Sequence, residues 1–336
     1  MGVFLFNYKK YMFKPTLEFL EFFLETIPFL FSLIVLTILA IALSKSIKKH
    51  SKIYNWIFGT ICLSFTIPVI FKAFGIFIPS IMMIPILGTI AAELSSATYF
   101  LHPVLVIIMF MGAFSPKHKY IGRLMTIRKE LSILVGFPFF AHIAKRLFHT
   151  FPGSWNFFMN YEESIASPRV TSVAGSTIEN AIFVLGVVMT VFFLVLWITS
   201  FASIKRKMGG KKWKSLQRWS YGLYAMLFIH SVGLQLGELM SYNAAQEKIT
   251  TVAAKTELVA ESKQAQDRHS QKAAPAKSSG HGHGHGPKRF SFSDIDVPRD
   301  TKAKMNIFIY FLVYGSYLYF RLKKAKTDRL KRTSKS

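Results

Sequence analysis

The sequence contains one cysteine, Cys62, among 336 residues, and it has far fewer acidic than basic side chains. A single cysteine excludes an internal disulfide, an iron–sulfur cluster held by several thiolates and covalently attached c-type haem. Seventeen Asp and Glu against 42 Lys and Arg leave a formal net charge of +25. Such an excess is also typical of nucleic-acid-binding proteins. Here the basic residues lie in short runs between apolar stretches, which indicates membrane topology, so we expect no nucleic-acid partner.

Hydrophobic residues make up 51% of the chain, and Phe alone contributes 33 of them. A helix needs about 20 apolar residues to cross a bilayer. Seven stretches qualify: 26–45, 56–78, 95–114, 131–151, 179–203, 217–240 and 305–322. The sequence therefore predicts an all-α integral membrane bundle of about seven transmembrane helices in contact with the lipid bilayer. We interpret 79–94, which is apolar but broken by prolines, as an interfacial or re-entrant connection.

The short loops differ in their content of Lys and Arg. The segments 45–52, 115–130 and 204–218 and the tail from Arg321 onward are strongly basic, whereas 152–178 carries one basic residue. Because basic loops stay in the cytoplasm, seven spans place these segments inside and the N-terminus outside. We expect a multi-pass protein of the bacterial inner (cytoplasmic) membrane.

Histidines inside the predicted spans are the most informative polar residues, because a polar side chain there is costly and marks function by default. His142 lies midway along the fourth span, and His149 follows seven residues later. Seven residues make almost two helical turns, so both share a face, about 10 Å apart along the axis. Lys145 and Arg146 lie within the same broad face. One helix thus carries a polar stripe in an apolar setting.

His230 lies in the sixth span, which runs in the same direction as the fourth. His142 follows Glu130 by 12 residues and His230 follows Gln217 by 13, so we expect the two imidazoles at nearly equal depth. Facing histidines at matched depth are the arrangement that clamps a haem between two axial ligands. The alternative is that each histidine only hydrogen-bonds a neighbouring helix, which is our interpretation of His102.

The cations beside His142 fit the same hypothesis. Lys145 and Arg146 lie one turn outward of it, where they would pair with haem propionates. His149 would approach the propionates, a quinone or a second haem.

Two parts of the chain, 94–149 and 209–230, resemble the ferric-reductase-like transmembrane domain. The closest type is the haem-binding membrane subunit of the bacterial periplasmic methionine sulfoxide reductase system. The similar motifs are Ala113-Phe114-Ser115-Pro116, Gly122-Arg123, Arg128-Lys129-Glu130-Leu131, Phe139-Phe140-Ala141-His142 and the basic segment Gly209–Tyr221. His142 and His230 match the positions of family histidines.

The resemblance covers roughly 56–240 and extends to the last span, and it implies a core of six helices that binds haem b and carries electrons across the membrane. Gln217 departs from the family, which has histidine in its Leu-His-Arg signature there. Histidines 13 residues apart on that helix would serve two haems or alternate ligation, so without the first of them we expect one haem b; a second haem, a quinone or a flavin stays open.

Four regions follow from these patterns. They are an N-terminal extension with an extra transmembrane helix (1–54), ferric-reductase-like haem-binding helices (55–240), a disordered external loop with some helix near its start (241–304), and the last transmembrane helix with its basic tail (305–336). In the loop, His281, His283 and His285 alternate with glycine. Imidazoles bind copper, nickel or zinc, but a flexible backbone imposes no geometry, so we expect either a loose metal site or a plain linker.

The leading hypothesis is a membrane b-type cytochrome. It would take electrons from quinol or a cytoplasmic flavoprotein and pass them to an external acceptor, either a partner oxidoreductase or a metal ion. No flavin or nicotinamide domain and no Gly-rich phosphate motif follow the spans, so we expect an electron-transfer subunit and not a self-contained reductase. The alternative is a transporter or metal-efflux component that collects metal with the His-Gly loop, although we find no internal repeat in its favour.

Overall fold

The computed structural model describes residues 26–78, 97–270 and 298–333, together with Phe23, Gly88 and Glu93. The side chains of 260–270 and 331–332 lie outside this description. All regular structure in the described residues is helical, with no strand among them, which confirms the all-α class. Most of the predicted connection 79–94 falls outside the described residues, and so do His281, His283 and His285.

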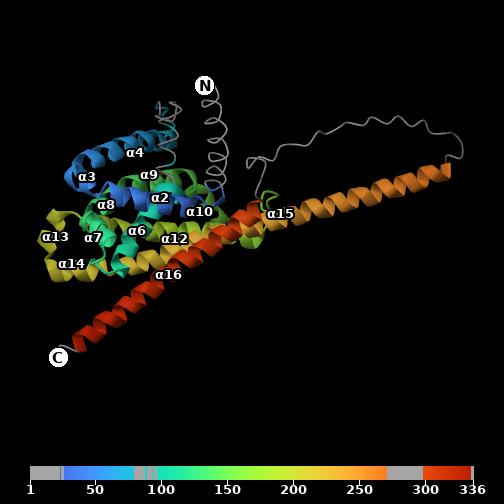
Figure 1. Ribbon diagram of the computed structural model, residues 1–336. Helices are drawn as coiled ribbons and strands as arrows, with labels where there is room; N and C mark the ends of the chain where they lie inside the picture. Colours follow the sequence, from blue (N-terminus) through green and yellow to red (C-terminus); the bar gives the residue numbers. More distant parts are fainter. Residues whose placement is uncertain are drawn as a thin grey trace, which may run out of the picture.

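The helices follow one another with short turns between most of them (Figure 1). They are α2 (Pro28–Ala42), α3 (Ser44–Lys49), α4 (Ser51–Ala73), the π-helix η2 (Ala97–Leu101), α6 (His102–Ala113), α7 (Lys119–Thr126), α8 (Arg128–Leu134), α9 (Gly136–His149), α10 (Phe151–Met159), α11 (Tyr161–Ala166), α12 (Val173–Ile198), α13 (Ala202–Met208), α14 (Gly210–Gln217), α15 (Ser220–Ser270) and α16 (Arg299–Thr333).

Four helical stretches are long and apolar enough to cross a membrane. They are α4, α8 with α9 (Arg128–His149), α12, and Gly210–Val259, which joins α14 to most of α15. The apolar helices α2 and Ala97–Ala113 are shorter. The chain therefore has the helices of a multi-pass membrane protein, and the count of seven spans stays a prediction.

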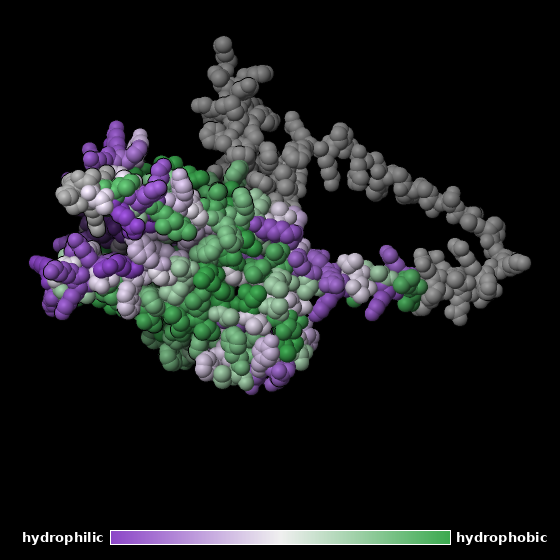
Figure 2. Space-filling view, turned by 90° about the horizontal axis from the view of Figure 1, so that it is seen from below, coloured by the Kyte–Doolittle hydropathy of each residue, from purple (hydrophilic) through white to green (hydrophobic). Residues whose placement is uncertain are grey.

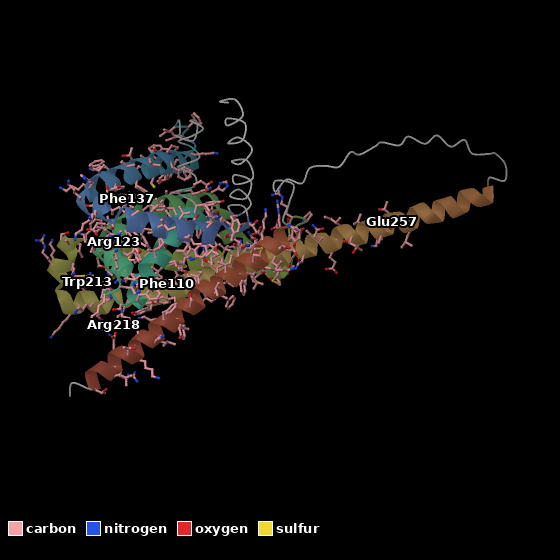
Figure 3. All side chains as sticks on the ribbon, in the orientation of Figure 1. Phe110, Arg123, Phe137, Trp213, Arg218 and Glu257 are labelled. Atoms are coloured by element: carbon pink, nitrogen blue, oxygen red, sulfur yellow. The ribbon has the colours of Figure 1, made fainter. Side chains whose placement is uncertain are left out.

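Apolar and charged surfaces separate along the molecule. Figure 2 shows a hydrophobic band across the body and hydrophilic side chains gathered beyond its two ends. At one end lie the basic helices α3, α7, α13 and α14 and the C-terminal part of α16 (Figure 1). The distal half of α15 extends from the opposite end, where Glu257 is labelled in Figure 3. The segments that the sequence assigns to the cytoplasm thus share one end of the bundle.

Local sequence decides where two of the helices begin. The Ser172 hydroxyl oxygen accepts a hydrogen bond from the Gly175 backbone N–H at 3.1 Å, a cap that starts α12 at Val173, six residues before the predicted span. Pro103 has no N–H to donate into the preceding turn, and this turn is the π-helix η2. His102 lies at the junction between η2 and α6.

Glycines let α12 and α15 pack backbone to backbone. A Cβ atom on Gly233 would overlap the Ile182 side chain, and one on Gly237 would lie 3.1 Å from the Gly175 carbonyl oxygen. Small residues spaced four apart, such as Gly233, Gly237 and Ser241, are a common device for close helix packing in membranes. His230 lies on the same face of α15, and this close packing brings it into contact with α12.

The same broad face of α12, nearer its C-terminal end, contacts α9. The Phe139 ring stacks on Phe193 with 3.7 Å between centroids, and Phe151, just beyond α9, lies 6.0 Å from Phe183. The Trp197 indole N–H donates to the Ile133 carbonyl oxygen at 3.0 Å, at the turn between α8 and α9. These contacts make α9 antiparallel to α12. Because α9 and α15 both contact α12, the depth of a residue on either helix can be compared through the α12 residues at the same level.

Other contacts complete the bundle. Helix α4 packs on the outer face of α9 through Cys62, Phe65, Phe137 and Ala141. Helix α16 packs against α15 and α6. Helix α15 continues past residue 240, the predicted start of the loop, as far as Ser270, and the sequence predicts some helix near the start of that loop.

Candidate functional site

His230 is held against α12 by one of its two ring nitrogens. Its Nδ1 lies 3.0 Å from the Ile182 carbonyl oxygen, and its Cε1 lies 3.2 Å from the place where a Cβ atom would stand on Gly186. A carbonyl oxygen only accepts hydrogen bonds, so Nδ1 carries the proton and donates it. In the neutral ring the lone pair is then on Nε2. This tautomer, fixed by a backbone carbonyl, is the usual one of a metal-ligating histidine.

His142 lies on α9, half-buried, one turn beyond Phe139. Three residues on a helix turn by about 300°, so His142 is about 60° from the direction in which Phe139 meets α12. His230 thus contacts α12 directly, whereas His142 lies on the neighbouring helix α9, about 60° from the ring that contacts α12.

Measured along α12, the two histidines do not lie at the equal depth that the sequence predicts. Phe139 meets Phe193 and Phe151 meets Phe183, whereas His230 contacts Ile182 and Gly186. By helical rise, His142 lies about 9 Å nearer the basic end than His230. The count from Glu130 and Gln217 assumed that equal numbers of residues give equal depth, and the contacts of α9 and α15 with α12 contradict that assumption.

The outer part of the α9 stripe comes level with His230. Arg146 is one turn beyond His142 and lies close enough to His230 for their charges to interact. His149 follows on the same face. The side chains of Lys145, Arg146 and His149 are exposed, so each of them is accessible to a propionate or another anionic group.

His102 is the centre of a second polar cluster and is only 4% exposed. Its Nε2 lies 2.8 Å from the Tyr314 hydroxyl, and its Nδ1 lies 3.4 Å from the Ser231 hydroxyl oxygen. Ser231 donates its own hydrogen to the Leu227 carbonyl oxygen at 2.8 Å. The His102 Nδ1–H therefore donates to Ser231, and its Nε2 accepts from Tyr314. Both nitrogens have partners, which supports the structural interpretation of His102.

Aromatic rings enclose His102 on the remaining sides. The ring centroids of Phe29 and Tyr310 lie 4.5 Å and 5.4 Å from that of the imidazole. The cluster thereby connects α2, α6, α15 and α16. Ser231 also follows His230 in the chain, so α15 contributes consecutive residues to the two histidine sites.

Gln217, which replaces a family histidine, is at the end of α14. Its side-chain amide donates to the Thr199 hydroxyl at 3.2 Å, and the nearby Trp213 indole N–H donates to the Thr199 carbonyl oxygen at 2.9 Å. Both bonds tie the basic loop to the end of α12. Gln217 thus anchors the end of α14 to the end of α12, and a short turn separates it from α15, the helix of His230.

The described part of the chain contains no cluster of three or more His, Cys, Asp or Glu side chains able to hold a metal ion. A haem needs fewer protein ligands than such a cluster supplies, so this finding does not bear on it. The predicted metal residues His281, His283 and His285 lie outside the described residues.

Sequence reasoning missed the hydrogen-bonding partners of both buried histidines. Tyr310, Tyr314 and Tyr317 recur at helical spacing in the last span, and this pattern indicates a polar face turned inward. Gly186, Gly233 and Gly237 likewise indicate a close helix contact. Comparisons with models of protein families, with curated proteins and with solved structures found no match for this chain.

Proposed function

We propose that the protein is a membrane b-type cytochrome that moves electrons between partners on the two sides of a bacterial inner membrane. The observation that carries the proposal is the hydrogen bond from His230 Nδ1 to the Ile182 carbonyl oxygen, 3.0 Å long, inside an apolar helix pair. It fixes the tautomer whose Nε2 is free to bind iron. The resemblance of 56–240 to ferric-reductase-like membrane domains implies that the bound group is haem.

The residues around His230 fit the needs of such a group. A bound haem b would supply a one-electron couple. The chain supplies His230 as one ligand, fixed by α12, and a second histidine from α9. We retain His142, the family position, as this second ligand. Arg146, with Lys145 beside it, supplies positive charge for propionates at the level of His230, and His149 lies on the same face.

The charge separation of the bundle supports the orientation that we propose for it in the membrane. The end with α3, α7, α13 and α14 would face the cytoplasm, where quinol at the membrane surface or a flavoprotein would donate electrons. An oxidoreductase or a metal ion outside would accept them. The proposed topology has seven spans, with α2, η2–α6 and α16 added to the four long apolar helices.

The test is a visible spectrum of the purified protein, expressed with added haem, before and after dithionite. A b-type haem gives a Soret band and a sharp reduced α band. Their absence from the intact protein would disprove the proposal. The His230→Ala variant should lose the six-coordinate spectrum, and His118→Ala, which removes an exposed loop histidine, should keep it.

The second ligand is tested by one comparison on α9. Loss of the six-coordinate spectrum in His142→Ala and its retention in His149→Ala would support the proposed pair. The reverse result would assign the ligand to His149, at the level of His230, and would contradict His142.

A further inference from the structure

A pocket of about 590 Å³ opens at the basic end of the bundle, where α2 passes into α3 beside α7. Its polar lining is formed by Ser44, Lys45 and Lys48 from one side and by Arg123 and Thr126 from α7. Figure 3 labels Arg123 at this end of the molecule. The pocket is remote from His230 and plays no part in the proposed electron transfer.

The lining carries three cations and no acidic residue. The side chains of Lys45, Lys48 and Arg123 are exposed, and among the described residues the one ion pair is between Lys304 and Asp300. No described carboxylate therefore neutralises these three cations. They repel one another across the pocket, and an anion bound between them would relieve this repulsion.

The hydroxyl groups of the lining do not add donors to this set. Ser44 donates its hydrogen to the Ile41 carbonyl oxygen at 2.9 Å, and Thr126 donates to the Arg123 carbonyl oxygen at 2.7 Å. Recognition of an anion therefore depends on Lys45, Lys48 and Arg123. Ammonium and guanidinium groups together are a typical donor set for phosphate.

An apolar surface leads from the membrane band to the pocket. Ile34 and Ile38 on α2 are 53% and 61% exposed. Ala42 is also exposed, and Lys45 follows it. At 100° per residue these four positions lie within about 80° of one another on a helix. The stripe thus gives a track for a hydrocarbon chain that ends at the cations.

We propose that this pocket binds the phosphate of an anionic phospholipid, with an acyl chain along the α2 stripe. A phosphate group alone would satisfy the cations, but only a lipid would also cover the exposed isoleucines. Basic pockets between helices on the cytoplasmic side are known places for such headgroups. Bound lipid would hold α2 and α3 against the short amphipathic helix α7.

The experiment counts lipids on the delipidated full-length protein by native mass spectrometry during titration with phosphatidylglycerol. The pocket variant is Lys45→Gln/Lys48→Gln/Arg123→Gln. The control, Lys49→Gln/Lys52→Gln/Lys119→Gln, removes the same charge from exposed positions outside the pocket lining. We expect the pocket variant to bind phosphatidylglycerol on the order of a hundredfold more weakly, because it loses three cations at the membrane surface. The affinity of the control should change by less than about threefold.

Three results would overturn the proposal: equal losses in both variants, equal binding of zwitterionic phosphatidylcholine, or displacement of the lipid by millimolar inorganic phosphate, which would assign the pocket to a soluble phosphate. Circular dichroism identifies a variant that fails to fold. In that case Arg123→Gln is compared with Arg123→Lys, and only the charge-retaining variant should bind as the native protein does. The count of bound lipids does not depend on haem, so it separates this proposal from the electron-transfer proposal.

Discussion

His102 of α6 and His230 of α15 lie in neighbouring sites, and their surroundings differ in one decisive respect. His102 has a hydrogen-bond partner on each ring nitrogen, Tyr314 and Ser231. His230 has a backbone carbonyl on Nδ1 and keeps the lone pair of Nε2. The first arrangement holds helices together and leaves nothing for a ligand. The second leaves the Nε2 lone pair for the ligand that we propose, so the partners of the ring nitrogens separate the two histidines better than burial does.

The largest expected effect concerns iron binding. His230→Gly should abolish six-coordinate haem and leave a cavity that added imidazole fills, restoring the spectrum. His102→Gly should keep the haem spectrum, because neither of its nitrogens is available to iron. Reduced-minus-oxidised spectra with and without imidazole measure both. A variant of His102 that loses haem and regains it with imidazole would reverse the assignment of the two histidines.

The next largest effect, on the stability of the fold, is expected at the glycine contact that holds α15, with His230, close to α12. Gly233→Ala places a Cβ atom into the Ile182 side chain and should destabilise the fold by about 1–3 kcal/mol. Gly315→Ala on α16 meets nothing within 4 Å and should be neutral or stabilising by up to about 1 kcal/mol. Thermal unfolding of the two variants in one detergent compares them. Equal stabilities would show that α12 and α15 are not in close contact.

The cluster of His102 should respond to the loss of a single hydroxyl group. Tyr314→Phe leaves His102 Nε2 without its donor in a buried site, and we expect a loss of about 1–2 kcal/mol. Tyr319→Phe is the matched control, because Tyr319 is 59% exposed. Denaturant titration in mixed micelles measures the difference. If both substitutions cost the same, the hydrogen bond to His102 contributes nothing.

The smallest effect is expected at Gln217, away from both histidines. Gln217→Ala removes one hydrogen bond to Thr199 in a half-buried setting and should cost about 0.5 kcal/mol. The haem spectrum should be unchanged, since Gln217 lies beyond a turn from the helix of His230. Stability and spectrum are recorded on the same sample. A shifted spectrum would mean that this end of α14 does contact the cofactor.

The sequence predicted the membrane class well because the signal is local. Long apolar runs separated by basic loops follow from the cost of charge in lipid, and they require no knowledge of packing. The same local reasoning failed at element ends. The Ser172 cap starts α12 before the predicted fifth span. Equal depth of His142 and His230 also failed, because depth in a bundle depends on how each helix packs and not on residue counts alone.

By itself the sequence determined that this chain has apolar helices for a bilayer, a basic end and a few costly histidines within the apolar stretches. Only the tertiary structure decided which histidine is committed to hydrogen bonds on both sides and which keeps a free nitrogen. The reason is physical, because hydrophobicity and charge are properties of single residues. The hydrogen-bond partners of the histidines, Tyr314 for His102 and Ile182 for His230, come from helices far apart in the chain. A histidine's role follows from those partners, and they are fixed by how α6, α12, α15 and α16 pack together.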